Sequence, residues 1–359
     1  MFPFFRYYFW FIVFLFLLFL SRPCFPARMI PEMVTVTTNQ TRNATWLDFS
    51  RFLHAEKGSQ VSGMSELKRY FNHFGYLSQK TPFNFTDEFD SQFESAVSLY
   101  QKKLGLSVTG KLDSDTISTI MAPRCGVSDA ASSRLLHSTR HFAYFSGKPR
   151  WVRGSPMSLT YAFSPYAAIT SLSMTEIRTA FQSAFSRWAS VIPVNFLETS
   201  GYETADIQIG FYTGEHGDGE PFDGVLGVLG HAFSPPTGKF HLDAAETWAV
   251  DFDREGSKAA VDLESVATHE IGHVLGLAHT NVKEAVMYPS LSPRRRKRDL
   301  KMDDVLGIQA LYGSNPNFTF SSLLESENSS NLAVRIKSDL IQWPLLLALG
   351  LFVLLFSRT

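Results

Sequence analysis

The sequence predicts a protein that mixes helices with strands, an α/β or α+β fold, in about two domains. Its 359 residues are enough for about two domains of roughly 100–200 residues each. Three short helical patterns lie within residues 65–122, and strands alternate with longer helices from 159 to 312. A connector rich in Ser, Arg and Gly, residues 126–155, separates the two parts.

The first part predicts a small three-helix domain over 65–122. Apolar residues spaced by three and four favour a helix from Ser65 that Gly75 ends, and a second helix over 87–104. Ser114 is placed to cap a third helix, which Pro123 ends. A polar segment with several Thr and Asn, residues 28–64, precedes this domain, and we expect it to be a loose leader.

The second part predicts a domain over 151–313 in which helices lie between strands. Alternation predicts strands and apolar stripes predict helices, in the order strand 159–163, helix 174–192, strands 194–196 and 206–211, and helices 261–275 and 303–312. Residues 214–246 are rich in Gly, His and Asp and show no periodicity. We expect irregular loops there, apart from an edge strand at 227–231 that could pair with a substrate.

The N-terminus carries an apolar run of 14 residues, 7–20, behind Arg6. That length is typical of a secretory signal peptide and short for a spanning helix. We expect a signal peptide over 1–27, cleaved within 21–28; an uncleaved signal anchor is the alternative. Cys24, one of only two cysteines, falls in this cleavage zone. A secreted protein left with Cys125 alone has no internal disulfide.

A second apolar run, 344–356, lies in the hydrophobic tail 340–359. Small residues, Asn328, Ser329 and Ser330, lie upstream in the linker 314–339, and a polar spacer 331–339 follows them. A site of small residues, followed by a polar spacer and an apolar tail, is typical of a GPI attachment signal. We expect a C-terminal lipid anchor that holds the chain at the extracellular face of the plasma membrane. A short membrane anchor, or an unprocessed tail on a protein of the extracellular space, remains an alternative.

Composition and glycosylation motifs agree with a secretory route. The net charge of −1 and the 19% of charged residues argue against a nucleic-acid partner. Asn-x-Ser/Thr tripeptides, which accept N-linked glycans in secreted proteins, occur at five positions: Asn39, Asn43, Asn84, Asn317 and Asn328.

The helix expected over 261–275 carries the decisive motif, His269-Glu270-x-x-His273-x-x-Gly276-x-x-His279. Histidines four residues apart share one helix face and suit two imidazole ligands of zinc. Gly276 can adopt the left-handed conformation that ends a helix and returns His279 as a third ligand. Three protein ligands leave a position for water, as in a catalytic zinc site, and Glu270 is placed to act as its general base.

This motif, followed eight residues after His279 by Met287 in Ala-Val-Met-Tyr-Pro, is that of the metzincins. With Thr280 after the third histidine, residues 65–313 resemble the matrix metalloproteinases, the plant-type members without a hemopexin domain in particular. The resemblance implies an α+β fold: a metzincin catalytic domain with a twisted mixed sheet and three helices, preceded by a peptidoglycan-binding-like helical prodomain. Met287 would be its Met-turn, a polarizable floor under the zinc.

The segment Pro123-Arg-Cys125-Gly-Val-Ser-Asp129 resembles that family's cysteine switch and begins a switch and activation linker, 123–150. A thiolate from Cys125 would be a strong fourth zinc ligand and would exclude the water. Arg124 could pair with Asp129 or with a carboxylate of the site. An activating protease should cut within about 134–150. The basic run 294–298 lies inside the catalytic domain, so we interpret it as an exposed loop rather than a processing site.

Three further histidines and an aspartate predict a second, structural zinc site. His216, Asp218, His231 and His241 would complete a tetrahedron with no open position. Such a site would pin a long loop that lacks regular structure.

Oxygen donors in the same segment predict at least one Ca²⁺, and the resemblance supports this. The expected donors are side chains and main-chain carbonyls: Asp223, Gly224, Leu226, Val228, Asp243 and Glu246. A second calcium at Asp206 is in doubt, because the stretch 235–240 lacks an acidic residue.

Together these observations predict the secreted zymogen of a zinc endopeptidase that hydrolyses internal peptide bonds of extracellular proteins. Cys125 would keep the zymogen latent. The alternative is a catalytically silent zinc-binding surface module, whose hallmark would be a missing Glu or His in the zinc motif.

Overall fold

The structure, a computed structural model, describes residues 46–77, 85–131 and 141–321. The expected signal peptide, Cys24, the GPI site and the hydrophobic tail lie outside these ranges, as do Asn39, Asn43, Asn84 and Asn328. Asn317 is described and exposed. Within the described ranges, no helix combines the length and the apolar character needed to cross a membrane.

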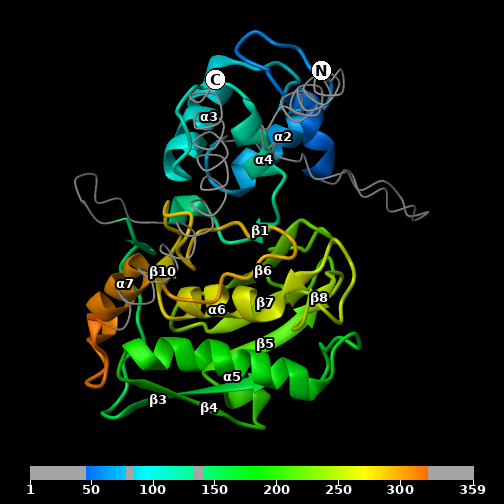
Figure 1. Cartoon of the computed structure of the whole chain (residues 1–359). Helices are drawn as coiled ribbons and strands as arrows, with labels where there is room; N and C mark the ends of the chain where they lie inside the picture. The colour runs from blue at the N-terminus through cyan, green and yellow to red at the C-terminus, as the bar shows by residue number, and fades with distance from the viewer. Residues whose placement is uncertain (1–45, 78–84, 132–140, 322–359) are drawn as a thin grey trace, which may run out of the picture. The chain divides into compact units, whose positions relative to one another are not determined.

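The helical unit contains α2 (Met64–His73), α3 (Ser91–Lys103) and α4 (Ser114–Ile120), close to their predicted positions. Figure 1 shows the three gathered as one group. Their core is strongly aromatic: Phe71, Phe93 and Tyr100 are fully buried, and the centre of the Phe71 ring lies 4.9 Å from that of Phe93 and 5.1 Å from that of Tyr100. The expected three-helix domain is therefore present.

Three details of this unit differ from expectation. The third helix is capped by Asp113 rather than by Ser114, because the Asp113 carboxylate accepts the Thr116 N–H at 2.9 Å. Helix α3 begins four residues later than predicted, because Asp90 caps it. The leader does not extend to residue 64: a 3-10 helix, η1 (Trp46–Phe52), buries Phe49 and Phe52 in the same core.

The second unit is built on a six-stranded mixed sheet, in the order β1-β6-β7-β5-β3-β4. The strands are β1 (Arg124–Cys125), β3 (Met157–Phe163), β4 (Val194–Glu198), β5 (Ile207–Tyr212), β6 (Val228–Ala232) and β7 (Lys239–Asp243). Strand β6 runs antiparallel to β7, and the other pairs are parallel.

Three helices complete this unit: α5 (Met174–Val191), α6 (Leu263–Val274) and α7 (Met302–Tyr312). Helices α5 and α6 pack against each other and lie along the sheet, as Figure 1 shows. The α5 stripe, with Phe181 and Trp188 fully buried, forms the core between helix and sheet. The mixed sheet with three helices is the predicted α+β architecture.

Two expectations for this unit need correction. Residues 214–246 contain a second strand, β7, besides β6, which lies close to the edge strand expected at 227–231. Four of the five β7 residues are buried, so no polar alternation could signal this strand. The unit also begins before residue 151: β2 (Ala143–Tyr144) pairs with β10 (Leu277–Ala278), and Tyr144 belongs to its core. Short pairs such as β8 (Trp248–Ala249) with β9 (Val261–Asp262) also escaped prediction, and they leave α6 to begin at Leu263.

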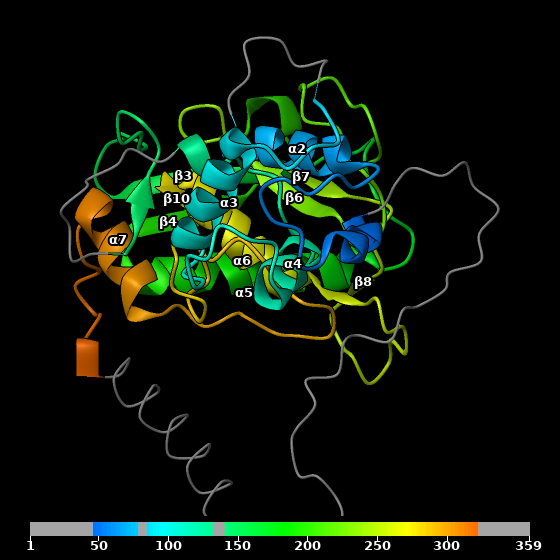
Figure 2. The same ribbon diagram turned by 90° about the horizontal axis from the view of Figure 1, so that it is seen from above.

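Strand β1 is supplied by the segment that follows the helical unit, and it occupies the edge of the sheet. Cys125 N–H donates to the Pro289 carbonyl at 2.8 Å, and Gly126 N–H donates to Gly230 of β6 at 2.8 Å. The segment therefore fills a slot between β6 and the stretch around Pro289. In Figure 2 helices α2 and α3 are seen in front of β6 and α6.

Candidate metal centre and active site

Helix α6 and the turn after it bring three imidazoles together. His269 and His273 lie one turn apart on α6, and Gly276, with φ of 107°, reverses the chain so that His279 returns to them. Any side chain at Gly276 would meet the Pro149 carbonyl at 2.2 Å, so the turn requires glycine. His279 Nε2 lies 3.3 Å from His269 Nε2 and 3.1 Å from His273 Nε2.

The opposite ring nitrogens fix how these imidazoles point. His269 Nδ1 lies 2.7 Å from the Val286 carbonyl, and His273 Nδ1 lies 2.7 Å from the Leu277 carbonyl. A carbonyl can only accept, so each Nδ1 carries the hydrogen and each Nε2 presents a lone pair. Burial lowers the pKa of both rings, which favours the neutral, ligating form.

Cys125 adds a sulfur to this group. Its Sγ lies 3.4 Å from His273 Nε2, and the four ligand atoms all lie within 4.8 Å of one another. Ligand atoms of a tetrahedral zinc lie roughly 3.3–3.8 Å apart, given bond lengths of about 2.0–2.3 Å. Burial and the neighbouring Glu270 raise the pKa of the Cys125 thiol, so forming the thiolate there is unfavourable. A bound dication would stabilise the thiolate and offset this effect. The donor set therefore fits zinc.

Glu270 lies directly beside this group and is fully buried. Both of its carboxylate oxygens lack a hydrogen-bond partner among the described residues, and the Cys125 thiol is a polar neighbour. Burial raises its pKa to about 8. A buried carboxylate kept free beside three imidazoles has the chemistry of a general base.

Asp129 ties the Cys125 segment to the third imidazole. Its Oδ1 lies 2.6 Å from His279 Nδ1, and its Oδ2 accepts bonds from Arg124 at 2.8 Å and from the Tyr76 hydroxyl at 2.6 Å. Arg124 and Asp129 are 1% and 5% exposed, so the ion pair is buried. Of the two partners foreseen for Arg124, the structure has Asp129. The contact of Asp129 with His279 was not foreseen, because 150 residues separate them.

Met287 packs against α6 at Gly272. A Cβ on Gly272 would come within 2.2 Å of its Sδ, so the chain packs Met287 directly against α6 between His269 and His273. The buried carboxylate of Asp304 accepts the N–H groups of Val286 and Met287 at 2.9 and 3.0 Å and holds this turn. Nothing in the sequence pattern singled out Asp304.

A second cluster gathers His216, Asp218, His231 and His241, whose ligand atoms lie within 4.8 Å of one another. One oxygen of Asp218 lies 2.7–2.9 Å from a nitrogen of each ring. Nδ1 of His216 lies 2.8 Å from the Gly214 carbonyl, which can only accept, so Nδ1 carries the hydrogen. In the neutral ring Nε2, which faces Asp218, therefore carries a lone pair. A lone pair against a carboxylate oxygen is repulsive, and a cation between them would relieve it, so this set also fits zinc.

Comparison with known proteins decides the family. Residues 150–313 match the matrixin family, and residues 60–120 match the peptidoglycan binding domain family. The chain is 53% identical to metalloendoproteinase 1-MMP of Arabidopsis thaliana over 319 residues, 85% of this chain and 86% of that protein. It is 58% identical to metalloendoproteinase 4-MMP of the same plant over 278 residues, 76% of this chain and 80% of that protein. The chain belongs to the matrixin family.

The family resemblance extends beyond plants. Human neutrophil collagenase is 40% identical over 221 residues, 60% of this chain and 43% of that protein. The chain is therefore a zinc metalloendopeptidase, a hydrolase that acts on polypeptides. Its kinship with plant matrixins confirms the predicted family.

This matrixin also carries three carboxylates in and beside the long loop: Asp223, which is exposed, and Asp243 and Glu246, which are buried. Desolvation raises the pKa of Asp223 to about 6 and that of Glu246 to about 8, and the charge of Asp243 raises both further. One oxygen of Glu246 accepts the Leu226 N–H at 2.7 Å, while the other is buried without a partner among the described residues. A buried carboxylate oxygen without a hydrogen-bond partner is unfavourable, and a bound cation would supply the missing partner. Oxygen donors suit Ca²⁺. Gly224 and Leu226 lie on the same loop, and Val228 begins β6 directly after it.

Asp206, where a second calcium was in doubt, already has partners in this matrixin. Its carboxylate pairs with Arg153 and accepts the N–H and hydroxyl of Thr160 at 2.9 Å. Because the Arg153 guanidinium neutralises Asp206, this carboxylate is a poor calcium ligand, in agreement with the doubt about a second calcium there.

The basic run 294–298 is bound to its surroundings. Arg294 donates to the carbonyls of Phe252, Glu255 and Ser257 at 2.7–3.0 Å. Arg298 pairs with Asp262 and Glu264. These contacts support a structural role for the run, and the expectation that it is not a processing site remains a prediction.

Proposed function

We propose that this matrixin is a secreted zymogen in which Cys125 completes the zinc coordination of His269, His273 and His279. The observation that carries the proposal is the convergence of three lone-pair nitrogens and one sulfur within 4.8 Å, beside a free buried carboxylate. Because the sulfur takes the position that water needs, the enzyme is latent while the Cys125 segment stays in its slot.

The proposed catalytic roles follow from the side chains around the slot. Zinc held there would polarise the scissile carbonyl and acidify a water. Glu270 would take a proton from that water and deliver it to the leaving amine, since its oxygens have no competing partner. The edge of β6, which now bonds to Gly126, would pair with the substrate main chain once the segment leaves.

The switch can be tested by replacing the sulfur. Cys125→Ser should make the full chain active without any activating treatment, because a hydroxyl is a far weaker zinc ligand than a thiolate. Ser128→Ala, in the same segment but outside the ligand set, should stay latent and serve as the control. A Cys125→Ser chain that stays latent and still binds zinc would contradict the proposed cysteine switch. An activating protease that cuts within 134–150 would release the segment in the natural enzyme.

The second metal site is proposed as a structural zinc held by His216, Asp218, His231 and His241. Four protein ligands leave no position for substrate, so the ion would stabilise and not react. It would pin the loop between β5 and β6 onto β7. A Ca²⁺ bound by Asp223, Asp243 and Glu246, with carbonyls of Gly224, Leu226 and Val228, is proposed for the same loop.

The location is proposed from the chain ends. A signal peptide over 1–27 would direct secretion, and a lipid attached near Asn328, Ser329 or Ser330 would hold the enzyme at the outer face of the plasma membrane. Extracellular polypeptides would then be its substrates. Treating intact cells with a phosphatidylinositol-specific phospholipase should release the enzyme into the medium. Retention on the cells after that treatment would contradict a GPI anchor.

A further inference from the structure

The turn after α6 joins the second imidazole of the proposed zinc site to the third. It runs from Val274 to Leu277, and the reversal at Gly276 leads into β10 and on to His279. The end of a helix leaves several carbonyls without partners inside the helix. In this turn two such carbonyls, those of Val274 and Leu275, are bound by side chains that lie far away in the sequence.

Trp151 and Tyr312 supply these two bonds. The indole N–H of Trp151 donates to the Val274 carbonyl at 2.9 Å, and the Tyr312 hydroxyl donates to the Leu275 carbonyl at 2.8 Å. The hydroxyl in turn accepts the main-chain N–H of Trp151 at 3.1 Å, so the two residues bind each other as well as the turn. Burial raises the pKa of Tyr312 to about 12, so the hydroxyl keeps the hydrogen that it donates. Because Trp151 precedes β3 and Tyr312 ends α7, the turn is tied to two distant parts of the chain.

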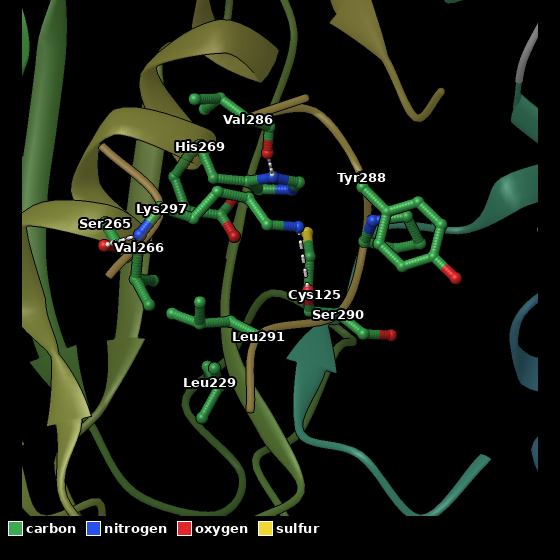
Figure 3. A pocket seen from close by; sticks show the side chains of 12 residues that line it. Cys125, Leu229, Ser265, Val266, His269, Val286, Tyr288, Ser290, Leu291 and Lys297 are labelled. Carbon is green, nitrogen blue, oxygen red and sulfur yellow. Dashed lines mark hydrogen bonds between the residues drawn. The ribbon is translucent and has the colours of Figure 1, made fainter. Parts of the chain in front are cut away.

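The position of this turn decides where two of the imidazoles lie. His273 Nδ1 lies 2.7 Å from the Leu277 carbonyl, so a shift of the turn would rotate the His273 ring. His279 follows two residues after Leu277 and would move with it. His269, by contrast, is held by the Val286 carbonyl, which lies outside this turn; Figure 3 draws that bond.

The hold on the turn becomes more important when the Cys125 segment leaves its slot. In the latent chain the Asp129 carboxylate, 2.6 Å from His279 Nδ1, also orients the third imidazole. Because Asp129 belongs to the departing segment, that contact is lost in the proposed active enzyme. The bonds from Trp151 and Tyr312 lie outside both the segment and the ligand group, so they remain.

We propose that Trp151 and Tyr312 are positioning residues for the catalytic zinc. By binding the carbonyls of the turn, they fix the spacing between His273 and His279, on which the affinity for the ion depends. Removing the partners that orient metal ligands typically lowers metal affinity or activity about 10–100-fold. This inference rests on the proposed function and deepens it, since it assigns the support of the third ligand to two residues outside the zinc motif.

The test removes the Tyr312 hydroxyl and measures zinc binding. Tyr312→Phe keeps the ring and loses both bonds of the hydroxyl. Zinc bound per chain is measured against buffered free Zn²⁺ on the full chain after mercurial activation, together with the peptidase activity of the same samples. One of the two proposed ions should bind at least about tenfold more weakly than in the wild type, and the other should bind as before. The activity should disappear together with the weakened ion. Trp151→Phe, which lacks the indole N–H, should weaken the same ion.

Tyr144→Phe is the matched control. Tyr144 is buried in the same core, and its hydroxyl donates to the Gly307 carbonyl of α7 at 2.8 Å. The variant therefore loses a bond of the same kind without freeing a carbonyl of α6. Both tyrosine variants should lower the melting temperature to a similar degree, since each loses one buried hydrogen bond to a carbonyl. Only Tyr312→Phe should lose zinc affinity.

Equal zinc binding in Tyr312→Phe and Tyr144→Phe, whether unchanged or equally weakened, would overturn the inference. Should Tyr312→Phe not fold, Trp151→Phe decides by the same comparison with Tyr144→Phe. A wild type that binds no zinc, or that stays inactive after the mercurial with both ions bound, would instead contradict the proposed function.

Discussion

The carboxylate of Asp129 lies 2.6 Å from Nδ1 of His279, although the two residues are 150 positions apart. The same carboxylate binds Arg124 and the Tyr76 hydroxyl. One side chain of the proposed switch segment therefore orients a zinc ligand, pairs with a buried cation and contacts the helical unit. Release of the segment would break the contact with His279, whereas the pair with Arg124 lies within the segment itself.

Asp129→Ala should weaken latency. The change leaves Arg124 buried without its partner, which typically costs about 3–5 kcal/mol, and it frees His279 Nδ1. We expect the purified full chain to show at least tenfold higher peptidase activity before any activating treatment. The exposed residue Asp48, in the same helical unit, offers a control: Asp48→Ala should be as latent as the wild type. Equal latency in both variants would contradict the role given to Asp129.

Glu270→Gln should retain zinc and lose nearly all turnover. The amide keeps the size of the side chain but cannot accept a proton, and a general base typically contributes 10²–10⁴-fold to the rate. The measurement is kcat/KM on a quenched peptide after mercurial activation, with zinc content determined on the same sample. Glu284→Gln, on the exposed loop near the site, should behave as the wild type. Activity within tenfold of the wild type in Glu270→Gln would exclude Glu270 as the base.

His241→Ala should lower the zinc content from two ions per chain to one. The remaining ligands, His216, Asp218 and His231, would no longer close the site, and the loop would lose its anchor. We expect the melting temperature to fall by more than about 5 °C, since metal binding to the folded state stabilises it. His54→Ala, at an exposed position, should change neither quantity. Two zinc ions in His241→Ala would refute the second site.

Calcium affinity should rise with pH between about 6 and 8. Desolvation raises the pKa of Asp223 to about 6 and that of Glu246 to about 8. Without calcium, these raised values contribute stability at low pH that is lost as the pH rises through 6 and then 8. A bound cation needs the ionised carboxylates, so protons compete with it and its stabilising effect grows over the same range.

The measurement for calcium is the shift in melting temperature caused by Ca²⁺ at pH 6, 7 and 8. It should increase at each step. Glu246→Gln should reduce the shift and flatten its dependence on pH, whereas Glu203→Gln, at an exposed position, should not. A shift that is absent, or the same at all three values, would contradict a calcium site built on these carboxylates.

Local patterns predicted much of this molecule. The α6 motif put His269 and His273 on one face, and Gly276 turned the chain as expected, because helix spacing and positive φ are local properties. Strand β7, with four of its five residues buried, escaped notice because continuous burial erases alternation. The contacts of Asp129 with His279 and of Tyr312 with Leu275 join separate elements, and nothing local could signal them. Asp113 and Ser114 are both residue types that cap helices, and only the backbone geometry decides that Asp113 is the cap of α4.

The most direct test measures the peptidase activity of the purified full chain on a quenched peptide, before and after a thiol-reactive mercurial, with and without a zinc chelator. Displacing the Cys125 sulfur should open the fourth zinc position. The account predicts a latent protein that becomes active with the mercurial and loses that activity with the chelator. An enzyme fully active from the start, or one that stays inactive after the mercurial with its zinc still bound, would contradict it.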